Sequence, residues 1–551
     1  MAGTGGTGTD ARGPRYGLLL LLAALPLLFV RLGAKDVWEA SEGRPLESAR
    51  EMRLAGDALV QRTNGLVDLT KPPVYAWATM AAFAVAGGDS EAAGRSPSVL
   101  ATLGVLAAAF VLARRIAGPR AGFLAGLALL TTPKVLWQAR LAELETLLAL
   151  GVLWAWVAFD AFLEAPPGRR RILLSVAFHA LVGFAFLVKG PVALLLTWPA
   201  AIAYAAATGR AASLVRPTFL AGLPATVLVG LSWFAAVVWR DPTHLDTFLA
   251  YAKGENVGHL RGPLYYVAQW PLYALPWTPL ALMGLAWRFR GPLPPEGARR
   301  AMLPVVAFAV TFVLQSLLRP KQTHYLVPVV FPMGAVLAAL VVERWLAARA
   351  AADDLARAVA LPFALLAAIW VAGTVVPALD RDDALPWIAA ALGAALGGTL
   401  FARLRRRGTS RAGAIAATAI SGLVALLGLG AGWIVPRFDA RMSSREFLAA
   451  VDGATPRGAP LGWTVFGSHS DYLWYLPIER VGRDGIPEIL GASDADTTAR
   501  VRTWLVEDGR RHAIVTGGQA DALGAAAEVL VRDDAFQRKG RRVALVRGKT
   551  P

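Results

Sequence analysis

The sequence contains no cysteine among its 551 residues, and only 17% of its residues are charged. The absence of cysteine excludes disulfide frameworks, thiolate zinc sites and iron–sulfur clusters, although it does not identify the redox compartment. The charged residues are too few for a soluble domain, in which about a quarter of the residues carry a charge. Histidine is scarce as well, and no two of the six histidines have the spacing of metal ligands, so no metal site is predicted.

Apolar residues make up 56% of the chain and fall in long blocks. Several blocks are long enough, or nearly so, to cross about 30 Å of hydrocarbon as helices. They cover residues 17–30, 147–162, 218–238, 301–318, 325–342 and 412–435. The first block is also compatible with a signal peptide, but no small-residue cleavage site follows it and charged sequence begins at Arg31, so we interpret it as the first span. The composition predicts a polytopic membrane protein.

The formal net charge of +17 raises the question of a nucleic-acid partner. Much of the basic excess lies in six short connections between apolar blocks, as it does in the cytoplasmic loops of membrane proteins. These connections hold twenty arginines: Arg114, Arg115, Arg120, Arg169, Arg170, Arg171, Arg210, Arg216, Arg288, Arg290, Arg299, Arg300, Arg344, Arg349, Arg357, Arg403, Arg405, Arg406, Arg407 and Arg411. The charge therefore indicates topology and requires no nucleic acid.

Placing the arginine loops in the cytoplasm sets the predicted topology. We expect a cytoplasmic tail over 1–15, a transmembrane domain of about thirteen helices over 16–438, and an external α/β domain over 439–551. The arginine loops all fall on the cytoplasmic side only if residues 73–87 do not cross the membrane. These residues are too few for a span, so we expect them to lie on the outer surface or to re-enter the membrane. The chain is thus predicted to be a mainly α-helical, multi-pass protein of the inner (plasma) membrane.

The first external segment, residues 33–97, carries many charges and is expected to contain surface-lying helices, one of them over about 46–54. A solvated, charge-balanced helix is the alternative interpretation of most of these charges. Lys71 differs because Pro72 and Pro73 fix the chain beside it at the entry to an apolar stretch. Its ammonium group suits a phosphate, although a lysine that merely snorkels to the interface has the same pattern.

Further charged and aromatic residues recur on the same predicted face. Arg140 and Glu145 stand at the external entrance of the 147–162 block, and Lys189 interrupts a long apolar stretch, where a simple interfacial anchor is the alternative. Later external connections add Glu255, Asn256, His259, Lys321, His324 and Tyr325. Cations, carboxylates and aromatics on one face are typical of a pocket for an anionic headgroup.

An ordered set of motifs runs through about residues 15–350. It consists of Lys71-Pro72-Pro73, Ala139-Arg140 with Glu145, Lys189-Gly190-Pro191, Glu255-Asn256-Val257-Gly258, Pro276-Trp277, and Lys321 with His324-Tyr325-Leu326-Val327-Pro328. The set resembles the bacterial aminoarabinose (lipid A) transferases and protein O-mannosyltransferase-like enzymes, which are GT-C glycosyltransferases. The resemblance implies a membrane enzyme that works on the outer face of the membrane.

This resemblance implies transfer of a sugar from a polyprenyl-phosphate carrier to an external lipid, glycan or protein acceptor, with inversion and with lipid phosphate as leaving group. It assigns Lys71 to the phosphate and Glu145 to the family's second acidic position. The family's first-loop Asp-Glu pair and arginine appear as Ser41, Glu42 and Arg44, so the catalytic candidates are Glu42, Glu145 and Arg44. The other external candidates are expected to bind the donor. No cofactor is required by this scheme, and a divalent cation stays open because GT-C enzymes differ in using one.

Two other functions remain open. Ser41 in place of the family acid leaves the hypothesis of an inactive protein that binds the lipid carrier, although a phosphate acceptor would make a base dispensable. A transporter would need internal repeats and ionisable residues at midplane depth, and mid-span charges are nearly absent. Transfer of a sugar is the preferred hypothesis.

The C-terminal residues have shorter apolar runs, as expected for an α/β domain. The pattern predicts a helix opened by a capping box from Ser443 to Glu446, strands over 461–466, 512–516 and 543–546, and helices over 493–507 and 519–530. Gly517 and Gly518 form a turn or, less plausibly, a phosphate-binding loop. Acceptor recognition and a lid are the two roles considered for this domain.

Overall fold

The structure is a computed structural model that describes residues 13–252, 259–286, 295–347, 427, 430, 435–464, 470–482, 485–490, 493–508, 510–533 and 542–549. The chain divides into two compact units. The first unit comprises residues 1–30 and 98–434, and the second comprises 31–97 and 435–551. The division therefore differs from the expected one, because the whole segment 33–97 groups with the C-terminal residues rather than with the helices on either side of it.

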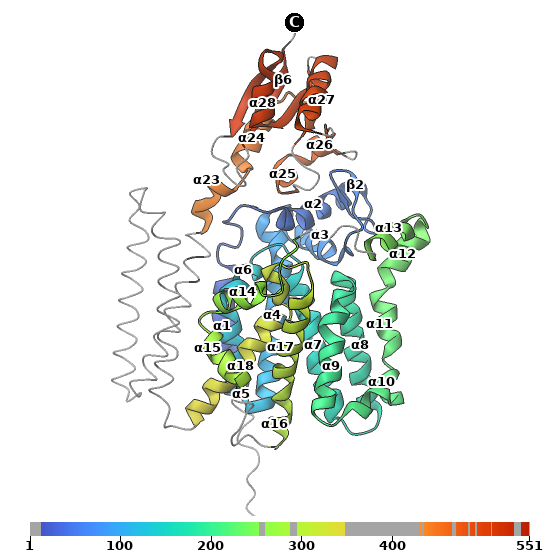
Figure 1. Cartoon of the computed structure of the whole chain (residues 1–551), viewed down its shortest axis with the longest axis vertical. Helices are drawn as coiled ribbons and strands as arrows, with labels where there is room; N and C mark the ends of the chain where they lie inside the picture. The colour runs from blue at the N-terminus through green and yellow to red at the C-terminus, as the bar shows by residue number, and fades with distance from the viewer. Residues whose placement is uncertain are drawn as a thin grey trace, which may run out of the picture. The chain divides into compact units, whose positions relative to one another are not determined.

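The first unit is built of helices (Figure 1). Their bounds are α1 Gly13–Phe29, α4 Glu91–Ala117, which begins in the second unit, α5 Pro119–Leu130, α6 Pro133–Ala139, α7 Glu145–Glu164, α8 Arg169–Lys189, α9 Val192–Ala207, η1 Ala211–Val215, α10 Pro217–Leu220, α11 Leu223–Gly230, α12 Ser232–Arg240, α13 His244–Ala252, α14 Tyr265–Tyr273, α15 Thr278–Ala286, α16 Pro295–Arg300, α17 Met302–Leu317, η2 Thr323–Leu326 and α18 Val330–Ala347.

Four helical stretches of the described residues are long and apolar enough to cross a membrane: α4, α7, α8 and Gly297–Leu317. The stretch from α10 to α12 makes a fifth if its two parts, bent by 44°, are one span. The predicted block 218–238 is therefore broken, with the bend next to Gly230 and Ser232, a residue combination at which helices commonly kink. The block 412–435 lies almost wholly outside the described residues, so the count of thirteen stays a prediction.

Packing between helices fixes the ends that carry the candidate site. Helix α7 packs along α8, α5 packs against α18, and α9 packs against α17. Between α7 and α8, the ring of Phe159 lies 5.1 Å from that of Phe178, and Phe219 from α10 completes the contact at 6.0 and 5.8 Å. Aromatic pairs at these separations add to the stability that burial supplies.

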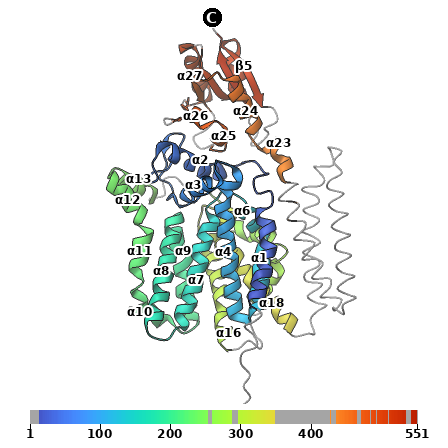
Figure 2. The same cartoon turned by 180° about the vertical axis from the view of Figure 1, so that it is seen from behind.

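The second unit combines two short segments of chain that are far apart in sequence. From residues 31–97 it takes α2 Ala40–Ala55, the hairpin β1 Arg62–Thr63 and β2 Leu66–Val67, and α3 Val74–Ala86. From the C-terminal part it takes η5 Val435–Phe438, α23 Asp439–Met442, α24 Arg445–Ala454, β3 Leu461–Trp463, α25 Ser470–Tyr475, α26 Ile478–Val481, α27 Asp494–Glu507, β4 His512–Thr516, α28 Gly517–Leu523, η6 Gly524–Ala526, β5 Ala527–Asp533 and β6 Val543–Gly548. Helix α2 packs on α25, as both views show (Figures 1 and 2).

The C-terminal part is a small α/β fold, as predicted. Its sheet has the order β3-β4-β6-β5, with β3 and β4 parallel and the other two pairs antiparallel. The strand predicted over 512–516 is confirmed at those bounds, and the helix predicted over 493–507 begins one residue later. The helix predicted over 519–530 is wrong, because α28 ends at Leu523 and a strand follows; β-branched residues Val529 and Val531 favour that strand.

The predicted capping box at Ser443 is also wrong. Helix α24 has Ser444 as its N-cap residue, and the Ser444 side chain makes no capping hydrogen bond. A capping box forms instead at α28, where Thr516 and Gln519 cap each other reciprocally. Gly517 and Gly518 are the first residues of that helix rather than a turn or a phosphate loop.

Helix α2 extends over Ala40–Ala55, beyond the predicted 46–54, and much of its surface is covered by protein. Glu47 on this helix is fully buried, and neither of its carboxylate oxygens accepts a hydrogen bond from the described residues. Burial raises the pKa of Glu47 to about 8, with Arg50 opposing the shift and Glu51 and Asp89 adding to it. The folded protein therefore keeps a proton on Glu47 at neutral pH.

We expect Glu47 to make the stability of the full chain fall as the pH rises. Between the ordinary pKa of 4.5 and the folded value of about 8, the folded state binds a proton that the unfolded state has released. Glu47→Gln should therefore raise the free energy of unfolding at pH 8.5 by on the order of 1–3 kcal/mol and flatten its pH dependence. Thermal unfolding of the detergent-purified protein from pH 5 to 8.5 measures this, with the exposed Glu479→Gln as control. An unchanged pH slope in Glu47→Gln would contradict it.

Candidate functional site

Glu145 and Lys189 meet although 44 residues separate them. Glu145 is the first residue of α7 and Lys189 is the last residue of α8, so each charge complements the dipole of its own helix. The Lys189 Nζ donates to Glu145 Oε1 at 2.5 Å. Gly190 ends α8 with φ +67, a conformation that favours glycine and lets the chain turn directly into α9.

His324 and Tyr325 join this pair from the short helix η2, between α17 and α18. The Nε2 of His324 lies 3.5 Å from Glu145 Oε1, and the Lys189 ammonium lies 4.5 Å from the centre of the Tyr325 ring. Burial raises the pKa of Tyr325, and Lys189 opposes that shift. Two of the later candidates, His324 and Tyr325, therefore lie beside Glu145 and Lys189. We call Glu145, Lys189, His324 and Tyr325 the α7–α8 cluster.

A divalent cation could be held at the same place. Glu143, Glu145 and His324 can each offer one ligand atom, and these atoms lie within 4.8 Å of one another. Gln138 already donates to Glu143, and Lys189 already donates to Glu145. Two carboxylates and an imidazole fit a divalent ion chemically, but such an ion would compete with the Lys189 ammonium for Glu145.

Other predicted residues have mainly structural contacts. Arg140 donates to the carbonyls of Leu27, Leu28 and Val30 at 2.8–3.0 Å, which satisfies the end of α1. Lys321 is 2% exposed and donates to the carbonyls of Arg261 and Leu318. These contacts hold backbone rather than present a cation for a ligand.

Three candidates from the predicted external connections of the first unit remain: His259, Glu255 and Asn256. His259 has φ +59, and its carbonyl accepts from the Lys321 amide at 3.0 Å. Glu255 and Asn256 lie outside the described residues.

Glu42 lies in the second unit and is buried between two cations. It accepts from Arg95 Nε at 2.7 Å and from Lys35 Nζ at 2.8 Å. Burial alone would raise the pKa of Glu42, but Arg95 and Lys35 outweigh it and hold that pKa below its ordinary value. A carboxylate held this way is a weak base, so the geometry favours a structural role for this predicted catalytic residue.

Two further predicted residues of this segment, Arg44 and Lys71, are only partly buried. Arg44 is 36% exposed and lies 3.9 Å from Asp68. Lys71 is half-buried, and its carbonyl accepts from the Gln61 side chain at 2.5 Å. Both keep the partial exposure that contact with a ligand would require.

Arg95 was not among the residues predicted from the sequence to form a site. Besides Glu42, the fully buried Arg95 guanidinium donates to the carbonyls of Leu32 and Lys35 at 2.9 and 2.7 Å. An arginine two residues before Pro97, at the edge of an apolar block, has no periodic signal that would single it out.

We expect Glu42→Ala to destabilise the second unit by about 3–5 kcal/mol, because it leaves the buried Arg95 and Lys35 cations without their carboxylate. Glu479→Ala, at an exposed position of the same unit, is the control and should change stability by about 0.5 kcal/mol or less. Thermal unfolding of both purified variants tests this. If Glu42→Ala unfolds like the wild type, the structural role is wrong.

Comparison with known proteins adds to this geometry. The model of the dolichyl-phosphate-mannose-protein mannosyltransferase family matches residues 70–239. An undecaprenyl phosphate-α-4-amino-4-deoxy-L-arabinose arabinosyl transferase from Pseudomonas fluorescens is 28% identical over 353 residues, which are 62% of this chain and 58% of that protein. A transferase of the same name from Edwardsiella ictaluri is 29% identical over 58% of each chain. The match therefore spans less than two thirds of these relatives.

Among solved structures, ArnT from Cupriavidus metallidurans bound to undecaprenyl phosphate superposes with a TM-score of 0.74. The superposition covers 98% of this chain and 100% of that one at 23% sequence identity. The apo structure of the same protein gives 0.73. At this identity the likeness establishes the fold. The family model and the curated relatives confirm the predicted resemblance to the aminoarabinose transferases and protein mannosyltransferases.

Proposed function

We propose that this chain is a membrane glycosyltransferase that moves a sugar from a polyprenyl-phosphate carrier to an acceptor on the outer face of the membrane. The observation that carries the proposal is the α7–α8 cluster, in which a lysine, a histidine, a carboxylate and a tyrosine from three separate helices meet within one fold shared with ArnT. The fold alone would not support the proposed transferase function, because one fold hosts many functions.

In the proposed reaction an acceptor oxygen attacks the anomeric carbon of the sugar, and the bond from that carbon to the phosphate oxygen breaks. The electron pair goes to the phosphate, which leaves as polyprenyl phosphate. Lys71 neutralises the charge that develops on this leaving group, as preorganised cations do in other group transfers. If the acceptor is a hydroxyl, its proton passes to a base; if the acceptor is a phosphate, no base is needed.

Of the two carboxylates predicted to be catalytic, Glu145 fits the chemistry better. Its partner Lys189 is 15% exposed and His324 is 16% exposed, so a ligand can approach the group. Glu42 and its partner Arg95 are 1% and 0% exposed. Glu145, with Lys189 and His324, is therefore assigned to the donor or acceptor, and Glu42 to the structure of the second unit.

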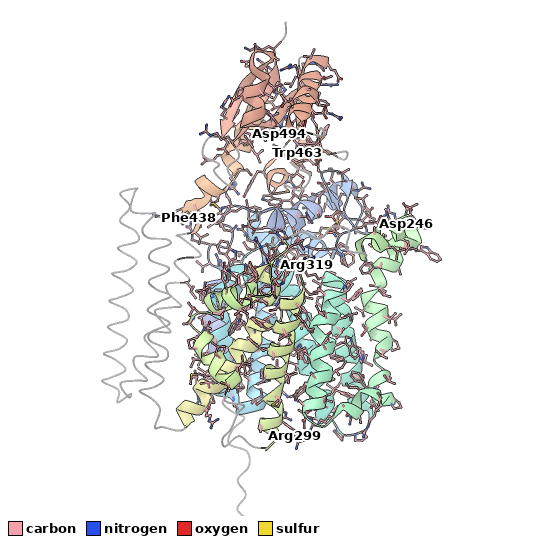
Figure 3. The ribbon with its side chains drawn as sticks, viewed as in Figure 1. Asp246, Arg299, Arg319, Phe438, Trp463 and Asp494 are labelled. Atoms are coloured by element: carbon pink, nitrogen blue, oxygen red, sulfur yellow. The ribbon has the colours of Figure 1, made fainter. Side chains whose placement is uncertain are left out.

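The proposal includes the topology derived from the arginine loops, with about thirteen spans, the N-terminus in the cytoplasm and the C-terminal domain outside the inner membrane. Figure 3 supports it, because Arg299, from an arginine loop, and Arg319, from a predicted external connection, lie at opposite ends of the helices of the first unit. The lipid, glycan or protein nature of the acceptor is left to experiment.

The transferase proposal predicts that purified full-length protein consumes a polyprenyl-phosphate sugar and releases polyprenyl phosphate. Lys71→Ala should lower kcat/KM for the donor by about 100-fold, because one charge-stabilising group is typically worth that much. Lys549→Ala, an exposed lysine of the C-terminal domain, is the control and should leave the rate unchanged. Mass spectrometry of the lipids measures both. Binding without turnover would instead support the second candidate, an inactive carrier-binding protein, which Ser41 in place of the family acid favours.

The topology predicts opposite accessibility for two exposed arginines. Because the chain has no cysteine, Arg299→Cys and Arg319→Cys each introduce a single thiol. A membrane-impermeant maleimide should label Arg319→Cys in intact cells and Arg299→Cys only after permeabilisation, with unlabelled wild type as control. Labelling of Arg299→Cys in intact cells would reverse the proposed orientation.

A further inference from the structure

The hairpin β1–β2 of the second unit turns at Asn64 and Gly65. Their φ angles are +55 and +74, so both sit in the left-handed region, as the two-residue Asn-Gly turn of a hairpin requires. Glu51 from α2 accepts hydrogen bonds from the amides of Asn64 and Gly65 at 2.6 and 2.8 Å. The turn is therefore fixed to α2 from within the same segment.

The Asn64 side chain reaches the C-terminal part of the unit. Its Nδ2 donates to the Ile486 carbonyl at 2.9 Å, and its Oδ1 accepts from the Ile486 amide at 2.6 Å. A Cβ on the neighbouring Gly485 would lie only 1.9 Å from the Asn64 carbonyl oxygen. The Asn64 side chain thus takes the place of a backbone partner for the buried Ile486, and the two segments lie close together at Gly485.

Ile486 is a rigid anchor for this contact. Its side chain is 2% exposed and belongs to the hydrophobic core with Leu461 and Trp463. The next residues continue beside β3, because Trp463 donates to the Pro487 carbonyl at 3.0 Å and accepts from the Ile489 amide at 2.8 Å. The central sheet of the C-terminal domain therefore supports Ile486 directly.

The hairpin in turn holds the backbone of Lys71. Gln61 directly precedes β1, and its side-chain amide donates to the Lys71 carbonyl at 2.5 Å. The Asp68 amide donates to the Gln61 carbonyl at 2.8 Å, which closes the hairpin at its open end. Hydrogen bonds and short stretches of covalent chain thus connect β3 to Lys71: Trp463 bonds to Pro487, Asn64 bonds to the preceding Ile486, and Gln61, three residues before Asn64, bonds to the Lys71 carbonyl.

We propose that Asn64 is a positioning residue through which the C-terminal domain sets the place of the Lys71 ammonium. The inference rests on the proposed function, in which Lys71 contacts the phosphate of the lipid carrier. It gives the C-terminal domain a role other than acceptor recognition or a lid: it orders the segment that carries the phosphate-binding lysine before any ligand arrives. Such preorganisation lowers the cost of ordering the segment on binding.

Two substitutions test the contact from opposite sides. Asn64→Gly keeps the left-handed turn and removes both side-chain bonds to Ile486, and Gly485→Ala forces the segments apart without altering the hairpin sequence. Ser493→Ala is the control, because it removes the side-chain cap of α27 elsewhere in the same domain. All are made in the full chain. The measurements are hydrogen exchange of residues 61–71 without ligand, the Kd for polyprenyl monophosphate, and kcat and KM for the sugar-loaded donor.

We expect Asn64→Gly and Gly485→Ala to speed exchange over 61–71 and to raise the Kd and KM about fivefold to tenfold, with kcat within about twofold of wild type. Ser493→Ala should change none of these. The inference is overturned if exchange is unaffected, or if exchange rises while Kd and KM stay at wild-type values. Failure of the proposed function is a separate result, recognised when Lys71→Ala binds polyprenyl monophosphate as tightly as wild type, and it removes this inference as well.

Discussion

The buried ion pair between Glu42 and Arg95 is the interaction on which the segment 33–97 depends. A carboxylate taken out of water is stable only when cations replace the lost hydration, and here Arg95 and Lys35 do so from both sides. Because Arg95 also binds the carbonyls of Leu32 and Lys35, the same guanidinium fixes the start of the segment against α4. Glu42 lies on α2, the hairpin β1–β2 follows α2 in the chain, and Lys71 comes shortly after the hairpin.

The first unit also contains a carboxylate paired with a cation, but this pair is more exposed than the pair of Glu42 and Arg95. Glu145 and Lys189 also neutralise each other, but they lie at helix ends and are 5% and 15% exposed, whereas Glu42 and Arg95 are almost wholly enclosed. Partial exposure leaves Lys189 accessible to a bound anion, whereas loss of Arg95 would leave Glu42 with an uncompensated buried charge. Exposure therefore separates the carboxylate suited to binding from the one suited to structure, although both were catalytic candidates in the sequence.

Features that depend on residues close together in the chain were predictable from the sequence. The apolar block 147–162 within α7, the interruption of an apolar stretch at Lys189 and the strand His512–Thr516 follow from apolar periodicity and breaker residues. Contacts between distant residues were not predictable: Arg95 with Glu42, Arg140 with the end of α1, and Asn64 with Ile486 depend on tertiary packing that a single sequence does not encode as a pattern. For the same reason the grouping of 31–97 with the C-terminal residues was missed.

The most direct test of the central claim compares the lipids and glycoconjugates of a strain that lacks this gene with those of its complemented parent by mass spectrometry. Transfer from a lipid carrier predicts that one polyprenyl-phosphate sugar accumulates in the deletion strain while that sugar disappears from one class of outer-surface acceptor. This result would identify the donor and the acceptor together. Identical polyprenyl-phosphate sugars, surface lipids and glycoproteins in the two strains would contradict the claim that the chain is a glycosyltransferase.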